Sequence, residues 1–324
     1  MFHQTKVSIL VPLYNASAFL ERCVRSLFEQ TYENLEFVFV NDGSTDNSIQ
    51  LLHEFCEQYP KRTNSCVIID RTTNKGVSFT RNELLQHATG DFISFVDADD
   101  YIEKNAIELL VENQKKYDSD IESCGFIIEY NNGNKKTILK NLNKEYFLDE
   151  MITGASGHEL YCRLFRRDVI KANHLTFSTN FNIAEDWLFL IKCAYYSKTI
   201  HNSQLCLYHY NCMNQASLMR AQVDWDKFKE RENVKFYQET YHFLSSMQIE
   251  ARNHFLLRTM EHQFIVLNEA IRHRDKDYHN YILGTNQDFP FPARNPKWSI
   301  LKNLKWRILQ NYRLSCAIIA PTNC

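Results

Sequence analysis

Short runs of β-branched and aromatic residues recur along the first third of the chain, and segments with helical spacing separate them. The runs occupy residues 7–11, 35–40, 67–69 and 92–96. Because they are continuous rather than alternating, they are typical of strands covered on both faces. The repeated order of strand, turn and helix predicts an α/β fold with a mainly parallel central sheet and flanking crossover helices.

The rest of the chain shows a different pattern. Residues 121–130 form a fifth candidate strand, and the following Asn131-Asn132-Gly133-Asn134 predicts a turn that heads a hairpin. A helical pattern runs from Glu185 through Tyr195, and residues 221–283 contain neither Gly nor Pro while apolar residues recur at three and four. We therefore expect two domains: an α/β domain at residues 1–220 and a helical region at residues 221–324.

Composition narrows the class of protein. The 324 residues include 37 Lys+Arg and 39 Asp+Glu, and this near balance argues against a dedicated nucleic-acid binder. A hydrophobic fraction of 44% is enough to bury a sizeable core. No C-x-x-C pair occurs, the N-terminus lacks signal-peptide features, and the longest uncharged stretch, residues 199–219, holds His, Asn and Gln throughout. We therefore expect a cytoplasmic protein with reduced cysteines and no membrane-spanning helix.

Polar and acidic residues follow each of the four predicted strands. They are Pro12-Leu13-Tyr14-Asn15 after the first, Asn41-Asp42-Gly43-Ser44-Thr45-Asp46 after the second, Asp70-Arg71 and Asn74-Lys75-Gly76 after the third, and Asp97-Ala98-Asp99-Asp100 after the fourth. In open α/β sheets, ligands bind beyond the carboxyl ends of the strands. We therefore expect these residues to converge on one edge of the sheet and to form a binding site there.

The fourth strand end carries three carboxylates within four residues: Asp97, Asp99 and Asp100. Such a group repels itself unless a cation lies among its members, and oxygen ligands two positions apart suit Mg²⁺ or Mn²⁺. The alternative is a helix cap, in which Asp99 or Asp100 caps a helix that starts near Ile102 and Glu103 completes a capping box. Because a cap uses one carboxylate, we assign that role to Asp100 and favour a metal for the others.

Two further positions have both a structural and a functional interpretation. Asp42 lies at a strand end, where its carboxylate can accept the N–H of a base, while Ser44 or Thr45 caps the next helix. Arg81 lies near the start of the helix after Gly76, where backbone N–H groups and a guanidinium favour anions. No G-x-G-x-x-G follows a strand and no G-x-x-x-x-G-K-[ST] occurs, which excludes dinucleotide and P-loop sites.

The four ordered strand-end motifs closely resemble those of the family 2 glycosyltransferases with the GT-A fold. The first three contain Pro12 to Asn15, Val40 to Asp46, and Asn74-Lys75-Gly76 with Arg81-Asn82, and the fourth runs from Gly90-Asp91 to the Asp97-x-Asp99 motif. Glu185-Asp186-Trp187 resembles the family's Glu-Asp pair, and Tyr208-His209-Tyr210 resembles the segment that closes its domain. Arg163 stands where the family usually has Lys, and beyond about residue 220 the resemblance stops.

The resemblance implies a metal-dependent, inverting, non-processive glycosyltransferase. The nucleoside of a nucleotide sugar would be held by Pro12 (through its backbone), Tyr14, Asp42 and Asp97. Arg81 would support the nucleotide or its phosphates, and Asp99 would ligate Mn²⁺ or Mg²⁺. Asp186, supported by Glu185, would deprotonate the acceptor hydroxyl. The implied donor is by default a uridine nucleotide sugar. The implied acceptor is a glycan or lipid-linked saccharide in surface polysaccharide synthesis.

Two other functions compete with this one. Sugar nucleotidyltransferases share the general fold, but they resemble one another in a Gly-rich, Arg-containing loop after the first strand. Here that position reads Pro12-Leu13-Tyr14-Asn15, without glycine. An inactive homologue would only bind sugar or nucleotide, and the intact Asp97, Asp99 and Asp186 speak against it.

The tail of the chain is basic and amphipathic. From residue 290 to the C-terminus there are six Lys or Arg residues and no acidic residue. Its apolar residues Trp298, Leu301, Leu304, Ile308 and Tyr312 can share one helical stripe, with Trp306 near its edge. This pattern is typical of a membrane-surface helix, which would place the protein at the inner face of the cytoplasmic membrane. The alternative, left open by the sequence, is that the stripe packs on the preceding helices.

Overall fold

The computed structural model describes residues 4–139, 147–153, 159–181, 183–214, 225–226, 234–247, 252–287 and 289–311. The chain divides into two compact units. The first consists of Met1–Met151 and Ser156–Ala221, and the second of Ile152–Ala155 and Gln222–Cys324.

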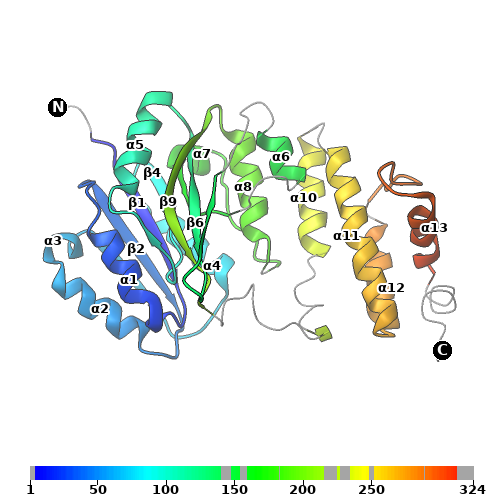
Figure 1. The fold of residues 1–324 in the computed structure, drawn as a ribbon, viewed down its shortest axis with the longest axis horizontal. Helices are drawn as coiled ribbons and strands as arrows, with labels where there is room; N and C mark the ends of the chain where they lie inside the picture. The colour runs from blue at the N-terminus through cyan, green and yellow to red at the C-terminus, as the bar shows by residue number, and fades with distance from the viewer. Residues whose placement is uncertain are drawn as a thin grey trace. The chain divides into compact units, whose positions relative to one another are not determined.

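A mixed sheet forms the centre of the first unit (Figure 1). Among the described residues it has nine strands: β1 (Val7–Leu13), β2 (Leu35–Asp42), β3 (Cys66–Arg71), β4 (Phe92–Phe95), β5 (Tyr101–Ile102), β6 (Ile121–Glu129), β7 (Lys135–Ile138), β8 (Arg163–Arg166) and β9 (Ile200–Asn211). The order is β3-β2-β1-β4-β8-β6-β9-β5, and β7 pairs with β6. Strands β1 to β4 are parallel, whereas β8 runs antiparallel to β4 and β6. The predicted α/β fold with a central sheet and flanking helices is confirmed, and its first four strands are parallel as expected, but the sheet as a whole is mixed: four of its strand pairings are parallel and four are antiparallel.

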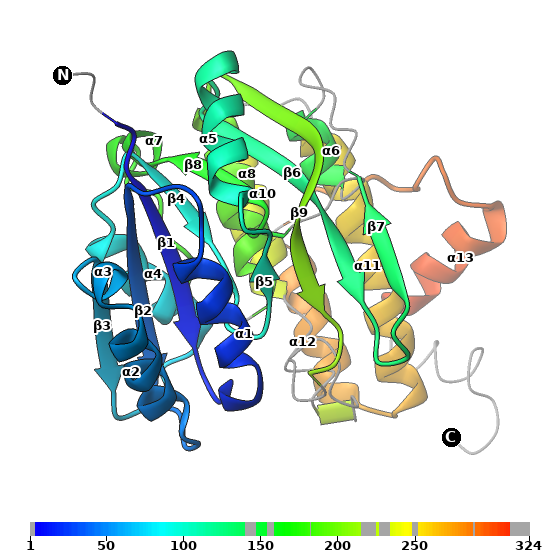
Figure 2. The same ribbon diagram turned by 60° about the vertical axis from the view of Figure 1, so that its left-hand side comes forward.

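Eight described helices belong wholly or mostly to this unit. They are α1 (Ser17–Phe28), α2 (Ser48–Gln58), α3 (Pro60–Thr63), α4 (Val77–His87), α5 (Ala106–Tyr117), α6 (Phe147–Thr153), α7 (Arg167–Ala172) and α8 (Glu185–Tyr196). Alternate residues of a strand point to opposite faces. Helices α1 and α2 lie on one face of the sheet and α8 on the other (Figure 2). Ile9 and Val11 of β1 belong to the core shared with α1 and α2, whereas Phe95 of β4 packs against Phe189 of α8. Both faces are thus covered, as continuous apolar runs require.

The parallel register brings the predicted site residues to one edge. Leu13 of β1 pairs with Asn41 of β2, and Asn41 pairs with Asp70 of β3. Because β4 is parallel to β1, the segment that follows Phe95 leaves the sheet at the same edge. Topology alone therefore collects the loops after four strands.

Both predicted helix caps are wrong. Asp100 is followed by strand β5, and α5 begins only at Ala106. The Asp100 side chain is buried and accepts hydrogen bonds from distant residues, so it is not available as a cap. Helix α2 begins at Ser48 without a side-chain cap from its N-cap residue, and the carboxylate of Asp46, rather than Ser44 or Thr45, accepts the Ser48 N–H (3.0 Å).

The second unit is helical in its described residues. It contains α10 (Val234–Ser246), α11 (Arg252–Arg272), α12 (Lys276–Asn286) and α13 (Ile300–Leu309). Helices α10 and α11 lie within residues 221–283 and α12 begins there, in agreement with the helical spacing of that stretch. Its core is built by buried residues of α11, α12, α13 and the segment before α13: Met260, Val266, Leu267, Ile271, Ile282, Trp298, Trp306 and Leu309. Across the residues that the structure describes, no helix is both long and apolar enough to cross a bilayer.

Candidate active site

The loops after β1 and β2 are tied together by side chain to backbone hydrogen bonds. The Asn15 N–H donates to Ser44 Oγ (2.9 Å), and the Thr45 N–H donates to Asn15 Oδ1 (2.8 Å). Asn15 adopts a left-handed backbone conformation with φ 47°, which asparagine tolerates better than most residues. The preceding Tyr14 is left 50% exposed at the strand end, so its ring offers an open surface for stacking.

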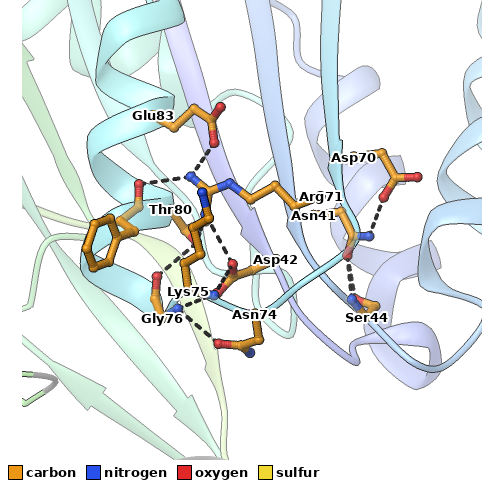
Figure 3. A network of polar contacts seen from close by, with 11 residues as sticks. Asn41, Asp42, Ser44, Asp70, Arg71, Asn74, Lys75, Gly76, Thr80 and Glu83 are labelled. Atoms are coloured by element: carbon orange, nitrogen blue, oxygen red, sulfur yellow. Dashed lines mark hydrogen bonds and ion pairs between the residues drawn. The ribbon is translucent and has the colours of Figure 1, made fainter.

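Asp42 organises the loop that leads into α4 (Figure 3). Its buried carboxylate accepts the backbone N–H groups of Lys75 and Gly76, both at 2.9 Å, and pairs with Arg71 Nη1 at 3.1 Å. Arg71 also bonds Thr80 Oγ1 (3.2 Å). An ionised carboxylate has about four acceptor positions. Three are filled here, and one remains for a further donor such as the N–H of a nucleobase.

Gly43 allows these loops to approach each other. Its φ is +70°, a region that side chains disfavour. A Cβ at this position would lie 2.7 Å from the backbone nitrogen of Asn74 and from the carbonyl carbon of Thr73. The Asp-Gly sequence therefore provides a carboxylate and, next to it, the space for the loop that this carboxylate binds.

Arg81 links the ends of three separate elements. Its guanidinium is buried, with Nη1 at 2.5 Å from Glu185 Oε1 of α8 and Nη2 at 3.6 Å from Asp97 Oδ1 after β4. It also lies over the ring of Phe177, with 5.6 Å from Cζ to the ring centroid. The structure thus brings together Arg81, Asp97 and Glu185. The positive charge of Arg81 thus compensates two carboxylates: that of Asp97, predicted to contact the sugar donor, and that of Glu185, next to the predicted base Asp186.

The two neighbouring carboxylates of α8 differ in their surroundings. Burial raises the pKa of Glu185 to about 7, although Arg81 opposes the shift. Burial also raises the pKa of Asp186, again against the effect of Arg81. One oxygen of Asp186 accepts the Trp187 N–H (2.8 Å), and within the described part of the chain no ion pair holds Asp186. Glu185 is therefore committed to Arg81, while Asp186 keeps an uncommitted oxygen.

The three carboxylates after β4 are separated by their partners. Asp100 turns inward, where it accepts the Tyr208 hydroxyl (2.6 Å) and the Asn211 N–H (2.7 Å). Asp99 Oδ2 accepts Asn214 Nδ2 (2.9 Å), and Asp97 faces Arg81. The mutual repulsion expected from the sequence is thus partly relieved by protein donors. Burial and the two neighbouring aspartates raise the pKa of Asp100.

Sequence reasoning missed the partners from the end of β9. Asn211 donates to the Asp99 carbonyl oxygen (3.1 Å), and Asn214 bonds the Asp99 carboxylate. The only signal was indirect: the Tyr208-His209-Tyr210 segment resembles the end of the family's domain. Nothing in the sequence indicated that the residues directly after it lie against the Asp97-x-Asp99 motif.

The residues after β4 fit a divalent ion that binds together with a substrate. In the part of the chain that the structure covers, no group of three or more His, Cys, Asp or Glu side chains is placed to hold a metal alone. The oxygen ligands that this strand end offers are the carboxylates of Asp97 and Asp99. Mg²⁺ and Mn²⁺ accept such a set when water and substrate phosphates complete the coordination.

The sheet order and the strand-end residues define a GT-A fold. Residues 8–173, about half of the chain, match the family model described as Glycosyl transferase family 2. The chain therefore belongs to this family. The crystal structure of residues 1–349 of TarS from S. aureus, in complex with UDP-GlcNAc, is similar with a TM-score of 0.73 and 20% identity, and the match covers 98% of this chain and 92% of that chain.

Curated relatives of the chain include enzymes named as a glycosyltransferase and as a polysaccharide synthase. A poly(ribitol-phosphate) beta-glucosyltransferase of Bacillus spizizenii is 34% identical over 63% of this chain and 32% of its own length. A hyaluronan synthase of Pasteurella multocida is 26% identical over 97% of this chain and 29% of its own length. The chain thus spans about a third of the length of each of these relatives.

Proposed function

We propose that the chain transfers a sugar from a nucleoside-diphosphate sugar to a hydroxyl group of a glycan or lipid-linked saccharide, with inversion at the anomeric carbon. The observation that carries this proposal is the Arg81 bridge between Asp97, at the strand edge that would hold the donor, and Glu185, beside the candidate base Asp186. The similarity to a structure with bound UDP-GlcNAc supports a uridine nucleotide as donor. The two polymer-directed relatives support an acceptor in surface polysaccharide synthesis.

The donor would be held at the sheet edge by residues from three loops. Tyr14 offers its exposed ring to the base, the Pro12 backbone and Asp97 contact the nucleoside, and Asp42 has one acceptor position left for a base N–H. Asp99 would hold Mn²⁺ or Mg²⁺, which when bound compensates the charge that develops on the departing diphosphate.

Asp186 would act as the general base. It takes the proton of the acceptor hydroxyl while the hydroxyl oxygen bonds to the anomeric carbon and the carbon–phosphate oxygen bond breaks on the opposite side. The proton ends on Asp186, and the electron pair leaves with the nucleoside diphosphate. The raised pKa of Asp186 suits this role because it strengthens the base. Because Arg81 is paired with Glu185, the Glu185 carboxylate would not compete with Asp186 for the acceptor proton.

A panel of nucleotide sugars, each incubated with acceptor and Mn²⁺, tests the class of reaction. We expect one donor, or a few related ones, to release nucleoside diphosphate. Pyrophosphate release from a nucleoside triphosphate and a sugar phosphate would instead identify a nucleotidyltransferase. Donor binding without any release of nucleotide would identify an inactive homologue.

Helix α13 divides the predicted apolar stripe into a buried and an exposed part. Of the predicted stripe, Trp298 and Trp306 pack in the core of the second unit, Ile308 is half-buried, and Leu301 and Leu304 are 78% and 53% exposed. Ile300, which was not part of the predicted stripe, is 87% exposed beside them. The packing alternative thus accounts for the tryptophans but not for the exposed residues. Tyr312 lies outside the described residues. We propose that this exposed apolar face, flanked by basic residues, contacts an anionic membrane surface at the inner face of the cytoplasmic membrane.

Membrane contact through α13 is tested with Leu301→Ser combined with Leu304→Ser. Burying each leucine in the interface is worth about 1.5–3 kcal/mol, so we expect the double variant to float with anionic liposomes at least ~10-fold less than wild type. Ile265→Ser, which removes an exposed isoleucine of α11, serves as the matched control and should float normally. Equal flotation of the double variant and wild type would remove the membrane proposal.

A further inference from the structure

Asn82, the residue after Arg81 in α4, clamps the backbone of Phe177. Its Nδ2 donates to the Phe177 carbonyl oxygen (2.9 Å), and its Oδ1 accepts the Phe177 N–H (2.8 Å). Both ends of the amide are used, and the two residues are 95 positions apart in the chain. The clamp therefore joins α4 to the segment that precedes α8.

The clamped Phe177 supports both Arg81 and helix α8. Its buried ring stacks on Phe189 of α8, with 4.0 Å between centroids and 11° between planes, and meets Phe95 of β4 edge-on at 5.7 Å. Arg81 lies over the same ring. Phe189 follows Glu185 by four residues, so the two lie on one face of the helix. Phe177 therefore helps to fix the position of the first turn of α8.

The start of α8 lacks a side-chain cap. Its N-cap residue is Ala184, which makes no side-chain hydrogen bond and has a left-handed backbone with φ 66°. A non-glycine residue in this region persists when surrounding contacts determine its conformation. The contacts available to this turn include the Arg81 ion pair with Glu185 and the stacking of Phe189 on Phe177.

We infer that Asn82 is a positioning residue for transfer: by clamping Phe177 it holds the first turn of α8 so that Arg81 engages Glu185 and Asp186 faces the acceptor. The inference rests on the proposed function, because it assigns the base to Asp186. A residue that only stabilised the fold would change the folding stability without changing the rate of the chemical step in the folded protein.

The test compares Asn82→Ala with Asn303→Ala. Asn303 is a matched control in the second unit, because its side chain also bonds both the N–H (2.8 Å) and the carbonyl oxygen (3.1 Å) of one other residue, Asn295. We expect Asn82→Ala to lower kcat between about tenfold and 10²-fold, since small misplacements of a reacting group have effects of this size. Nucleotide affinity should stay within about twofold of wild type. Asn303→Ala should leave both quantities unchanged.

A double-mutant cycle shows whether Asn82 acts through the base. If it does, Asn82→Ala should cause no further loss of kcat in an Asp186→Asn background. The same fold loss in both backgrounds, or an equal loss of kcat and nucleotide affinity, would overturn the inference. If Asn82→Ala does not fold, Asn82→Asp retains an acceptor for the Phe177 N–H and is tested in the same way.

Hydrogen exchange separates failure of the inference from failure of the proposed function. Amides in the first turn of α8 should exchange faster in Asn82→Ala than in wild type, and at the wild-type rate in Asn303→Ala. This measurement needs no substrate. Absence of transfer by wild type with every donor would overturn the proposed function, whereas unchanged exchange in Asn82→Ala would overturn the clamp.

Discussion

Asp186→Asn is expected to lower sugar transfer by roughly 10²–10⁴-fold, the usual contribution of a positioned general base. Asparagine has almost the same shape and can still accept the Trp187 N–H, so the fold should be preserved. Nucleotide affinity should be unchanged, because the base contacts the acceptor and not the donor nucleotide. Steady-state transfer rates and nucleotide titrations of the purified variant measure the two quantities separately.

Glu185→Gln serves as the contrasting variant. Glu185 is buried at 2.5 Å from Arg81, and removing one partner of a buried ion pair costs about 3 kcal/mol. We therefore expect this substitution to lower thermal stability as well as transfer, whereas Asp186→Asn lowers transfer alone. If Asp186→Asn transfers sugar at a near wild-type rate, or loses nucleotide affinity instead, the base is assigned to the wrong residue.

The pH dependence of transfer follows from the same assignment. A general base works only when deprotonated, and burial raises the pKa of Asp186 above its ordinary value. Transfer should therefore rise with pH through this raised pKa and be lost below it. Burial also raises the pKa of the neighbouring Glu185 carboxyl, to about 7, and the negative charge of Asp186 adds to this shift. In Asp186→Asn the acidic limb due to the base should disappear.

The sheet and the location of the site were predictable because they depend on local patterns. Continuous apolar runs mark β1 to β4, and a parallel arrangement then places the residues after each strand at one edge. Asp42 and Asp97 could be identified in this way without knowledge of any contact. The helical pattern from Glu185 likewise corresponds to α8.

The partners of the acidic residues could not be predicted, since they come from distant parts of the chain. Asp100 is bound by Tyr208, 108 positions later, and Arg81 by Glu185, 104 positions later. The local sequence pattern therefore predicted that Asp100 caps a helix, whereas in the folded protein its carboxylate accepts hydrogen bonds from the buried Tyr208 and Asn211. The same limitation hid the contact of Asn82 with Phe177. Asn82 belongs to the Arg81-Asn82 motif, but nothing in the sequence indicates that its amide bonds a residue 95 positions later.

Asp99→Asn is expected to abolish metal-stimulated transfer, with a loss on the order of 10³-fold or more. Stabilisation of the leaving diphosphate by a divalent ion is worth several kcal/mol, and each 1.36 kcal/mol changes a rate tenfold. The fold should persist because an asparagine oxygen can still accept the Asn214 amide, and the loss of one charge relieves repulsion from Asp97 and Asp100. Excess chelator should have the same effect on wild type. Transfer rates measured against Mn²⁺ concentration test both expectations.

Asp100→Asn distinguishes loss of the metal ligand from general disturbance of the loop. Asp100 is buried and accepts from both Tyr208 and Asn211, so an amide there would face two donors with one oxygen. We expect this variant to lose thermal stability but to retain stimulation by Mn²⁺, whereas Asp99→Asn should retain stability and lose stimulation. Added Mn²⁺ should also tighten nucleotide binding in wild type and not in Asp99→Asn, because Asp99 would hold an ion that compensates the charge of the diphosphate. Full transfer in excess chelator, or normal Mn²⁺ stimulation of Asp99→Asn, would show that Asp99 does not hold the ion.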